Sequence, residues 1–272
     1  MSQSPARPDS APGLSFRLWL ALGGIMLMTA ASPVDFTTSP GSQTREPWWQ
    51  ERFLEKQAEL HRQPVRLIFL GDSIIHSFEW DPRTPLWDHW YGGRGAVNLG
   101  FNGDITTDVI WRVRHGELDG LSPALAVILI GTNDLGKPPG QVAAAIEELV
   151  RLVHGRLPGT TILVLGILPS GKPEREQSAT RQINASLAAL YSQQGSIARY
   201  QDVSCVFLRH GRLNATLFRE PDVPGVTSPL HPTPRGLDLL AAAIEPTVAA
   251  ALGDRIRAAS DGPGDTDCRS DQ

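Results

Sequence analysis

The stretch from Leu67 to Ile74 constrains the fold more than any other part of the chain. Its sequence is Leu-Ile-Phe-Leu-Gly-Asp-Ser-Ile, a short apolar run that stops at a glycine and is followed by polar residues. Such a run predicts a buried strand of a parallel sheet that ends in a tight turn. Ser73 then lies at the carboxyl end of the strand, where open α/β sheets bind ligands. The first N–H groups of a helix that follows the strand can point there at developing negative charge.

Two roles for Ser73 follow from this position. The place suits a nucleophile, and it equally suits a helix N-cap, which is a common role of serine. On this stretch alone the N-cap is the simpler interpretation, so the rest of the chain has to decide between the two.

Three further stretches place polar residues where strands end or a helix begins. Residues 98–104 (Asn-Leu-Gly-Phe-Asn-Gly-Asp) end a second predicted strand, and residues 130–134 (Ile-Gly-Thr-Asn-Asp) end a third. Residues 230–233 (Leu-His-Pro-Thr) precede the last predicted helix. Together with Gly-Asp-Ser at 71–73, these stretches resemble, in chain order, the four signature blocks of the SGNH/GDSL hydrolases.

The resemblance can be narrowed to one branch of that superfamily. Residues 108–118, Asp-Val-Ile-Trp-Arg-Val-Arg-His-Gly-Glu-Leu, resemble the platelet-activating-factor acetylhydrolase branch, and the likeness extends from about Val65 to Leu252. The alternation of strands and helices predicts an α/β fold, a three-layer α/β/α sandwich with a parallel sheet and right-handed crossovers. The resemblance adds a five-stranded, flavodoxin-like strand order.

Periodicity places the individual elements. Four strands beyond the first are predicted, at 96–99, 124–130, 161–167 and within 197–206. Helices are predicted at 48–62, 105–115, 141–154 and 174–194, with a last one opening at Pro234. The segment with Trp80, Trp87, Trp90 and Tyr91 is interpreted as a loop packed over the core, and an aromatic wall for a substrate is the alternative.

The resemblance assigns the chemistry to particular residues. Ser73 is the expected nucleophile, and its backbone N–H, the N–H of Gly103 and the side-chain amide of Asn133 are the expected oxyanion hole. These residue types fit, because a glycine lets the backbone approach closely and an amide donates N–H groups without carrying a charge. Both Gly103 and Asn133 also have a purely structural interpretation as turn residues. Asp72 is interpreted as structural.

His231 is the expected general base, because it precedes a capped helix late in the chain and matches the family block Asp-x-x-His. The family's aspartate lies three residues earlier, where this chain has Ser228. A serine accepts a hydrogen bond from the imidazole but brings no charge to stabilise the imidazolium. Asp222 in the preceding loop is the candidate substitute, and a main-chain carbonyl is another way to orient the ring.

The implied function is an exported serine esterase that removes a short acyl group, in particular acetyl, from a lipid or glycan. The alternative is a catalytically weak or inactive carbohydrate- or lipid-binding module, because the position of the family aspartate is Ser228. No cofactor is predicted, and the histidines lack zinc-binding spacing such as H-E-x-x-H. Scattered basic residues and a net charge of −4 predict no nucleic-acid partner, and the oligomeric state stays open.

The beginning of the chain has the layout of a secretory signal peptide. Arg7 and Arg17 precede an apolar run at 18–28, and small residues follow at 29–31. The run is shorter than the roughly 20 residues that span a bilayer, so cleavage is favoured over an uncleaved anchor. The expected organisation is a signal peptide or anchor at 1–31, a linker at 32–46, the hydrolase domain at 47–257 and a disordered tail at 258–272. The expected location is periplasmic or extracellular.

The chain has only two cysteines, Cys205 and Cys268. A disulfide framework needs more than this, so the fold is expected to depend on its core. A length of 272 residues with 41% hydrophobic residues is enough for one large core.

Overall fold

The computed structural model describes Met1 and residues 46–79, 85–219, 228–259 and 267–268. By its internal contacts the chain divides into Met1–Val34 and Asp35–Gln272, and all the elements named below belong to the second unit. Apart from Met1 and Glu46, the expected signal peptide and linker lie outside the described residues. Within the described parts, no helix is both long and apolar enough to cross a membrane.

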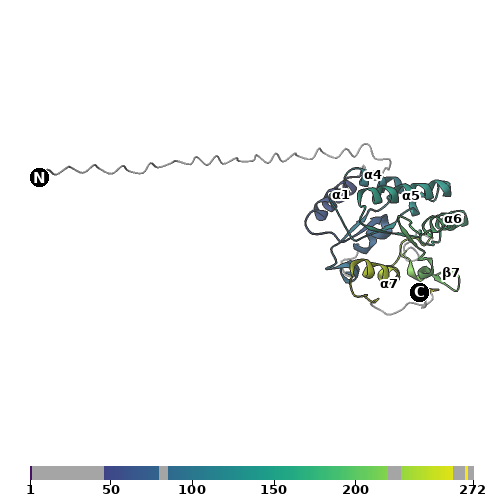
Figure 1. Ribbon diagram of the computed structural model, residues 1–272. Helices are drawn as coiled ribbons and strands as arrows, with labels where there is room; N and C mark the ends of the chain where they lie inside the picture. Colours follow the sequence, from purple (N-terminus) through teal and green to yellow (C-terminus); the bar gives the residue numbers. More distant parts are fainter. Residues whose placement is uncertain (2–45, 80–84, 220–227, 260–266, 269–272) are drawn as a thin grey trace. The chain divides into compact units, whose positions relative to one another are not determined.

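Five parallel strands form the central sheet, in the order β2-β1-β3-β4-β5 (Figure 1). They are β1 (Leu67–Gly71), β2 (Ala96–Gly100), β3 (Leu125–Leu129), β4 (Thr161–Leu165) and β5 (Arg199–Gln201). This order is the flavodoxin-like one, so the fold expected from the sequence is confirmed. Every residue of β1 is buried, as the continuous apolar run indicates for a strand covered on both faces. The carboxyl ends of β2 and β3 flank that of β1.

Helices cover both faces of the sheet (Figure 1). One face carries α1 (Pro47–Leu60), α4 (Thr106–Arg114), α5 (Pro139–Arg156) and α6 (Glu174–Tyr191). The other carries α2 (Ser73–His76), α3 (Leu86–Tyr91) and α7 (Pro234–Leu252). Alternate residues of β1 supply the two cores: Ile68 and Leu70 pack with the first set of helices, Leu67 and Phe69 with the second.

The segment before β2 corrects one sequence-based interpretation. Residues 86–91 form the helix α3 rather than a loop, and Trp90 and Tyr91 are buried in the core beneath it. Trp90 Nε1 donates to Asp238 Oδ1 of α7 at 2.9 Å, and the Tyr91 ring packs 4.6 Å from that of Phe69. These two rings are therefore core residues and not a substrate wall, while Trp80 lies outside the described residues.

The two cysteines are joined, which the sequence analysis did not predict. Cys205 and Cys268 form a disulfide with Cα atoms 4.9 Å apart. Beside it, the carboxylate of Asp267 accepts the N–H groups of His210 and Gly211, both at 2.7 Å. Residues 267–268 are therefore held against the hairpin of β6 (Leu208–Arg209) and β7 (Arg212–Leu213), although they belong to the segment interpreted as a disordered tail.

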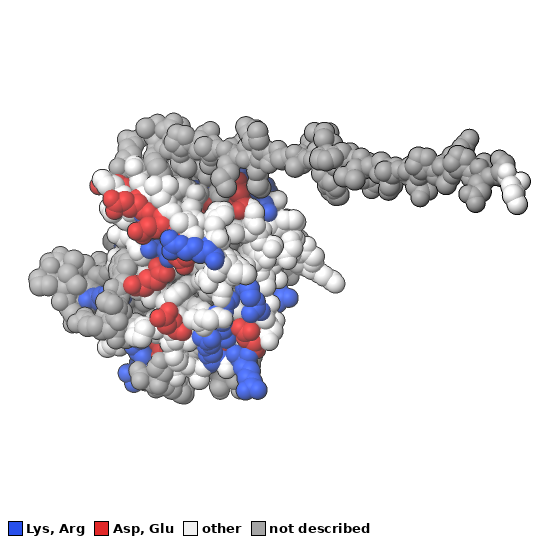
Figure 2. Space-filling view, turned by 90° about the vertical axis from the view of Figure 1, so that its left-hand side faces the viewer, with Lys and Arg blue, Asp and Glu red and all other residues white. Residues whose placement is uncertain are grey.

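Charged side chains of both signs are interspersed over the face of the molecule seen in Figure 2. They do not gather there into a field of one sign, and the chain as a whole carries a net charge of −4. A surface of this kind exerts little long-range attraction on a polyanion or a polycation.

Candidate active site

Ser73 is the first residue of α2, directly after the turn that ends β1. The N-cap of this helix is Asp72, whose Oδ1 accepts the N–H of Ile74 at 2.9 Å, so the capping role considered for Ser73 belongs to its neighbour. Ser77 Oγ donates to the carbonyl of Ser73 at 2.6 Å and fixes the same turn. The Ser73 side chain is then directed at His231, and its Oγ lies 3.0 Å from Nε2 of that ring.

The end of β2 lies directly against α2. A Cβ at Gly100 would come within 2.3 Å of the His76 backbone nitrogen, so only glycine allows this approach. The buried side chain of Asn98 donates to the α2 backbone at 2.8 Å and accepts the N–H of Gly100 at 2.9 Å. Phe101 N–H donates to the carbonyl of Gly71 at 3.1 Å. The segment after β2 therefore begins beside the turn that carries Ser73.

Gly103 and Asn133 follow β2 and β3, the two strands that flank β1. Gly103 has φ +80°, in the left-handed region that favours glycine. Asn133 lies in the short 3-10 helix η4 (Thr132–Asp134) and is exposed. Its Nδ2 donates to the carbonyl of Asp104 at 2.9 Å. The structure therefore brings Asn133 to the Gly103–Asp104 turn, on the sheet edge that also carries Ser73.

A buried guanidinium supports that turn. Arg112 of α4 is fully buried, and its Nε and Nη2 donate to Asp104 Oδ2 and to the carbonyl of Leu99, each at 3.1 Å. The same group stacks on the ring of Phe101, 4.1 Å from its centroid. Leu99, Phe101 and Asp104 all belong to the segment that carries Gly103, so one side chain holds that segment at three points.

Two buried carboxylates, Asp72 and Asp134, lie next to Ser73 and Asn133 in the sequence. The backbone N–H and the hydroxyl of Thr106 both donate to Asp134 Oδ2, at 2.8 and 2.7 Å. These bonds tie η4, and with it Asn133, to the start of α4. Burial raises the pKa of Asp72 to about 7, and the charge of Asp134 acts in the same direction. The hydrogen bond that Asp72 accepts from the N–H of Ile74 acts in the opposite direction. This cap of α2 is consistent with the structural role expected for Asp72.

His231 lies two residues before the N-cap of α7. Thr233 Oγ1 accepts the N–H of Gly236 at 3.2 Å, and the backbone carbonyl of His231 accepts the N–H of Arg219 at 2.9 Å. His231 is partly exposed, while Ser73 beside it is buried, with 5% of its surface exposed. A serine hydroxyl within hydrogen-bond distance of an imidazole is the arrangement of an activated nucleophile.

Comparison with known families agrees with this geometry. The model of the GDSL-like lipase/acylhydrolase family matches residues 69–239, which is more than half of the chain. The chain belongs to this family. The expected membership is therefore confirmed, and the enzyme class expected from the sequence, a carboxylic ester hydrolase, is the class of this family.

The GDSL-family protein is similar in sequence to curated proteins that are named acetylhydrolases. It is 34% identical over 124 residues to human platelet-activating factor acetylhydrolase IB subunit alpha1, covering 45% of this chain and 52% of that protein. The chicken alpha2 subunit is 33% identical over 124 residues, covering 45% and 53%. The chain thus spans about half the length of these relatives.

A solved structure shares the fold of the GDSL-family protein. It comes from Bacteroides fragilis and is described as a candidate acylhydrolase. The TM-score is 0.59 at 21% identity, and the match covers 74% of this chain and 96% of that one. At this identity the likeness concerns the fold.

Position 228 is where the GDSL-family protein departs from the family pattern. Ser228 is partly exposed, while Asp222, the candidate substitute, lies outside the described residues. The block that carries His231 is packed against the loop after β4: Gly171 N–H donates to the carbonyl of Pro229 at 2.6 Å, and a Cβ at Gly171 would come within 2.2 Å of the Pro229 ring. The backbone position of this block is therefore fixed by close contact.

Sequence reasoning did not identify the residues that support the site from beneath. Asp104 accepts Trp49 Nε1 at 2.7 Å as well as Arg112, and Arg112 also pairs with Glu117. The sequence did contain a signal for a buried arginine, because Arg112 is a charged residue among apolar neighbours in a predicted helix. Nothing in one sequence shows which carboxylates meet a buried arginine.

Proposed function

We propose that this protein is an exported serine esterase that hydrolyses short-chain esters, in particular acetyl esters of a lipid or glycan, through an acyl-enzyme at Ser73. The observation that carries the proposal is the 3.0 Å contact between Ser73 Oγ and His231 Nε2 at the carboxyl edge of the sheet. A serine hydroxyl is a weak nucleophile until an adjacent base takes its proton, and this contact supplies the base.

The reaction has two halves. Ser73 Oγ attacks the ester carbonyl carbon while His231 Nε2 takes the hydroxyl proton. The tetrahedral intermediate then collapses, the C–O bond to the alcohol breaks, and the alcohol leaves with the proton held on His231. Water then attacks the acyl-enzyme while His231 Nε2 takes a proton from it. The bond between the acyl carbon and Ser73 Oγ breaks, His231 returns the proton to Oγ, and the carboxylic acid is released.

The negative charge of the intermediate needs hydrogen-bond donors. We assign the backbone N–H groups of Ser73 and Gly103 and the side-chain amide of Asn133 to this role. One N–H of the Asn133 amide is used on the carbonyl of Asp104 at 2.9 Å, which orients the group and leaves its second N–H for an oxyanion. The flanking position of β2 and β3 beside β1 supports the assignment, because it puts donors on both sides of the nucleophile.

Two observations support export. The chain begins with the charged, apolar and small-residue pattern of a signal peptide at 1–31. The disulfide between Cys205 and Cys268 is of the kind that persists in oxidising compartments such as the periplasm or the extracellular space.

The acyl preference is tested with a series of p-nitrophenyl esters. We expect kcat/KM to be highest for acetate and to fall by at least about tenfold for octanoate. The preference is supported by the name acetylhydrolase that the curated relatives carry. Rates that rise with chain length would instead assign the protein to long-chain lipases, and absence of hydrolysis of the whole series would contradict the esterase function.

The second candidate function is a catalytically weak or inactive carbohydrate- or lipid-binding module. Ser228 favours it, because the family position for the carboxylate that stabilises the imidazolium holds an uncharged side chain. Variants at position 228 distinguish two cases: either no carboxylate orients His231, or a carboxylate from another residue does.

If position 228 is a vacant carboxylate site, Ser228→Asp is expected to raise kcat on p-nitrophenyl acetate by about tenfold or more, because the introduced charge stabilises the imidazolium. Asp222→Asn is the matched variant and is expected to change kcat little. Both are measured across pH 5 to 9, with folding checked by circular dichroism. A strongly impaired Asp222→Asn together with an unimproved Ser228→Asp would identify Asp222 as the third member of the triad and overturn the vacant-site account.

A further inference from the structure

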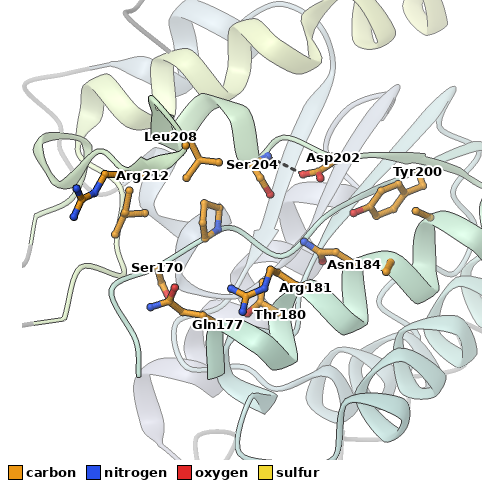
Figure 3. A pocket seen from close by; sticks show the side chains of 15 residues that line it. Ser170, Gln177, Thr180, Arg181, Asn184, Tyr200, Asp202, Ser204, Leu208 and Arg212 are labelled. Atoms are coloured by element: carbon orange, nitrogen blue, oxygen red, sulfur yellow. Dashed lines mark hydrogen bonds between the residues drawn. The ribbon is translucent and has the colours of Figure 1, made fainter. Parts of the chain in front are cut away.

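A pocket of about 860 Å³ opens on the same sheet edge, beyond β4 and β5 (Figure 3). Helix α6 forms one wall, and the 3-10 helix η5 (Ser204–Phe207) with the β6–β7 hairpin forms the other. Figure 3 shows Gln177 and Arg181 on α6 facing Ser204 and Leu208 across the pocket. Neither Ser73 nor His231 is among the lining residues, so the pocket is separate from the catalytic pair.

The strand order relates this pocket to the nucleophile. Ser73 follows β1, Ser170 follows β4 and Asp202 follows β5, so these residues share one edge of the sheet. At about 4.8 Å between strands, β4 and β5 lie roughly 10 and 14 Å from β1. Between the two sites, Gly171 next to Ser170 contacts Pro229 of the block that carries His231. A substrate bound at Ser73 therefore reaches the pocket only if its alcohol part is extended.

The lining side chains favour a neutral polyol. Asp202 offers a carboxylate, Arg181 and Arg212 offer guanidinium groups, and Ser204 and Tyr200 offer hydroxyls, all of them at least partly exposed. An acyl chain would desolvate these groups without bonding them, and that is costly. An anionic ligand would be repelled by the carboxylate of Asp202, and a cationic ligand would be repelled by the two arginines. A sugar both donates and accepts hydrogen bonds.

The pocket also provides apolar surface for the C–H faces of a sugar ring. Leu208 and Leu213 of the hairpin, Ala185 and Ala188 of α6 and the ring of Tyr200 line it alongside the polar groups. Concave sites that combine apolar surface with a few placed polar groups are typical of small-molecule recognition.

The hairpin wall is held in place from outside. The Cys205–Cys268 disulfide joins η5 to residues 267–268, and the carboxylate of Asp267 accepts the N–H groups of His210 and Gly211 at the tip of the hairpin. A wall fixed in this way needs little ordering when a ligand binds.

We propose that this pocket binds the carbohydrate part of an O-acylated glycan whose ester group lies at Ser73. The inference rests on the esterase function proposed above and narrows its substrate from a lipid or glycan to a glycan. The alcohol part of the ester extends along the sheet edge over Pro229 and Gly171 and enters the pocket between α6 and the hairpin.

Two tryptophan variants on α6 test the proposal. Ala185→Trp places a large side chain in the pocket from an exposed position that does not disturb the core. Ser186→Trp is the matched control, because Ser186 is exposed and lies about 200° around the helix from the pocket-lining Asn184. Each variant is assayed on p-nitrophenyl acetate, on acetylated xylo-, manno- and chito-tetraose, and on an acetylated glycerophospholipid.

We expect Ala185→Trp to lower kcat/KM by at least about tenfold on one or more of the tetrasaccharides and by less than about twofold on p-nitrophenyl acetate, whose alcohol is too short to reach the pocket. Ser186→Trp is expected to leave kcat/KM unchanged both on the tetrasaccharides and on p-nitrophenyl acetate. Arg212→Ala, on the exposed hairpin, gives the same selective loss and covers the case in which the tryptophan variant does not fold.

Three results overturn the proposal: an unchanged rate on every tetrasaccharide, an equal loss on p-nitrophenyl acetate, or a loss confined to the phospholipid. The esterase function itself fails in a different way. In that case the native protein does not hydrolyse even p-nitrophenyl acetate, so the variants cannot differ in their rates on any substrate.

Discussion

Ser73→Ala is expected to lower kcat on p-nitrophenyl acetate by on the order of 10⁵- to 10⁶-fold, the loss typical of removing the nucleophile from a serine hydrolase. The acyl-enzyme no longer forms, and His231, whose Nε2 lies 3.0 Å from the Ser73 Oγ, has no hydroxyl proton to take. The residual rate comes from binding and from whatever oxyanion donors remain in place. KM is expected to change little, because the hydroxyl contributes mainly to the chemical step. The measurement is steady-state kinetics.

Ser122→Ala is the matched control for this variant. Ser122 is an exposed serine just before β3, at the end of the sheet opposite to Ser73, so its removal is expected to leave kcat unchanged. A Ser73→Ala variant that is folded by circular dichroism and retains more than about a tenth of the native kcat would show that another group carries the reaction.

Asn133→Ala is expected to lower kcat by on the order of 10²-fold with KM nearly unchanged. The amide of Asn133 donates one N–H to Asp104, and the proposed role of its other N–H is to bond the oxygen that becomes negative in the transition state. Such a bond is stronger in the transition state than with the ground-state carbonyl, so its loss appears in kcat. The comparison is made with p-nitrophenyl acetate.

Asn102→Ala provides the comparison, since Asn102 is an exposed asparagine in the neighbouring turn. It is expected to keep kcat within about twofold of the native value, as surface substitutions usually do. If Asn133→Ala instead raises KM at constant kcat, Asn133 binds the substrate in its ground state, and the oxyanion assignment fails.

The sequence predicts the centre of the sheet well because β1, β2 and β3 each carry a strong and local signal. The short edge strand β5 is partly exposed, and the sequence places it only within 197–206. The apolar runs that become β1 and β3 are buried on both faces, and glycines mark the ends of β1 and β2. The blocks around Ser73, Gly103, Asn133 and His231 all follow strands or precede a helix, so their meeting at one sheet edge follows from parallel topology.

What the sequence does not predict depends on long-range partners. Arg112 is recognisable as a charged residue within an apolar helix, but its bond to Asp104 and its stacking on Phe101 depend on how α4 packs against the segment after β2. The disulfide of Cys205 and Cys268 joins residues 63 positions apart, and two cysteines alone give no geometry. The helix α3 was missed because prolines and glycines punctuate the segment around it.

The capping of α2 shows how a neighbouring residue decides between two interpretations. Serine at a strand-to-helix turn fits both an N-cap and a nucleophile, and the sequence leaves both open. In the structure Asp72 accepts the N–H of Ile74, so the Ser73 hydroxyl is available to contact His231. The position of the cap, one residue earlier than expected, is what separates the two roles.

The central claim is that Ser73 is a nucleophile activated by His231, and the most direct measurement is labelling of the native protein with a fluorophosphonate probe followed by sequencing of the labelled peptide. A serine reacts with such a probe only when a base activates it and an oxyanion site receives the charge. We predict a single labelled residue, Ser73, with labelling lost in His231→Gln and retained in Ser122→Ala. Labelling of a different serine, or no labelling of the folded protein, would contradict the account.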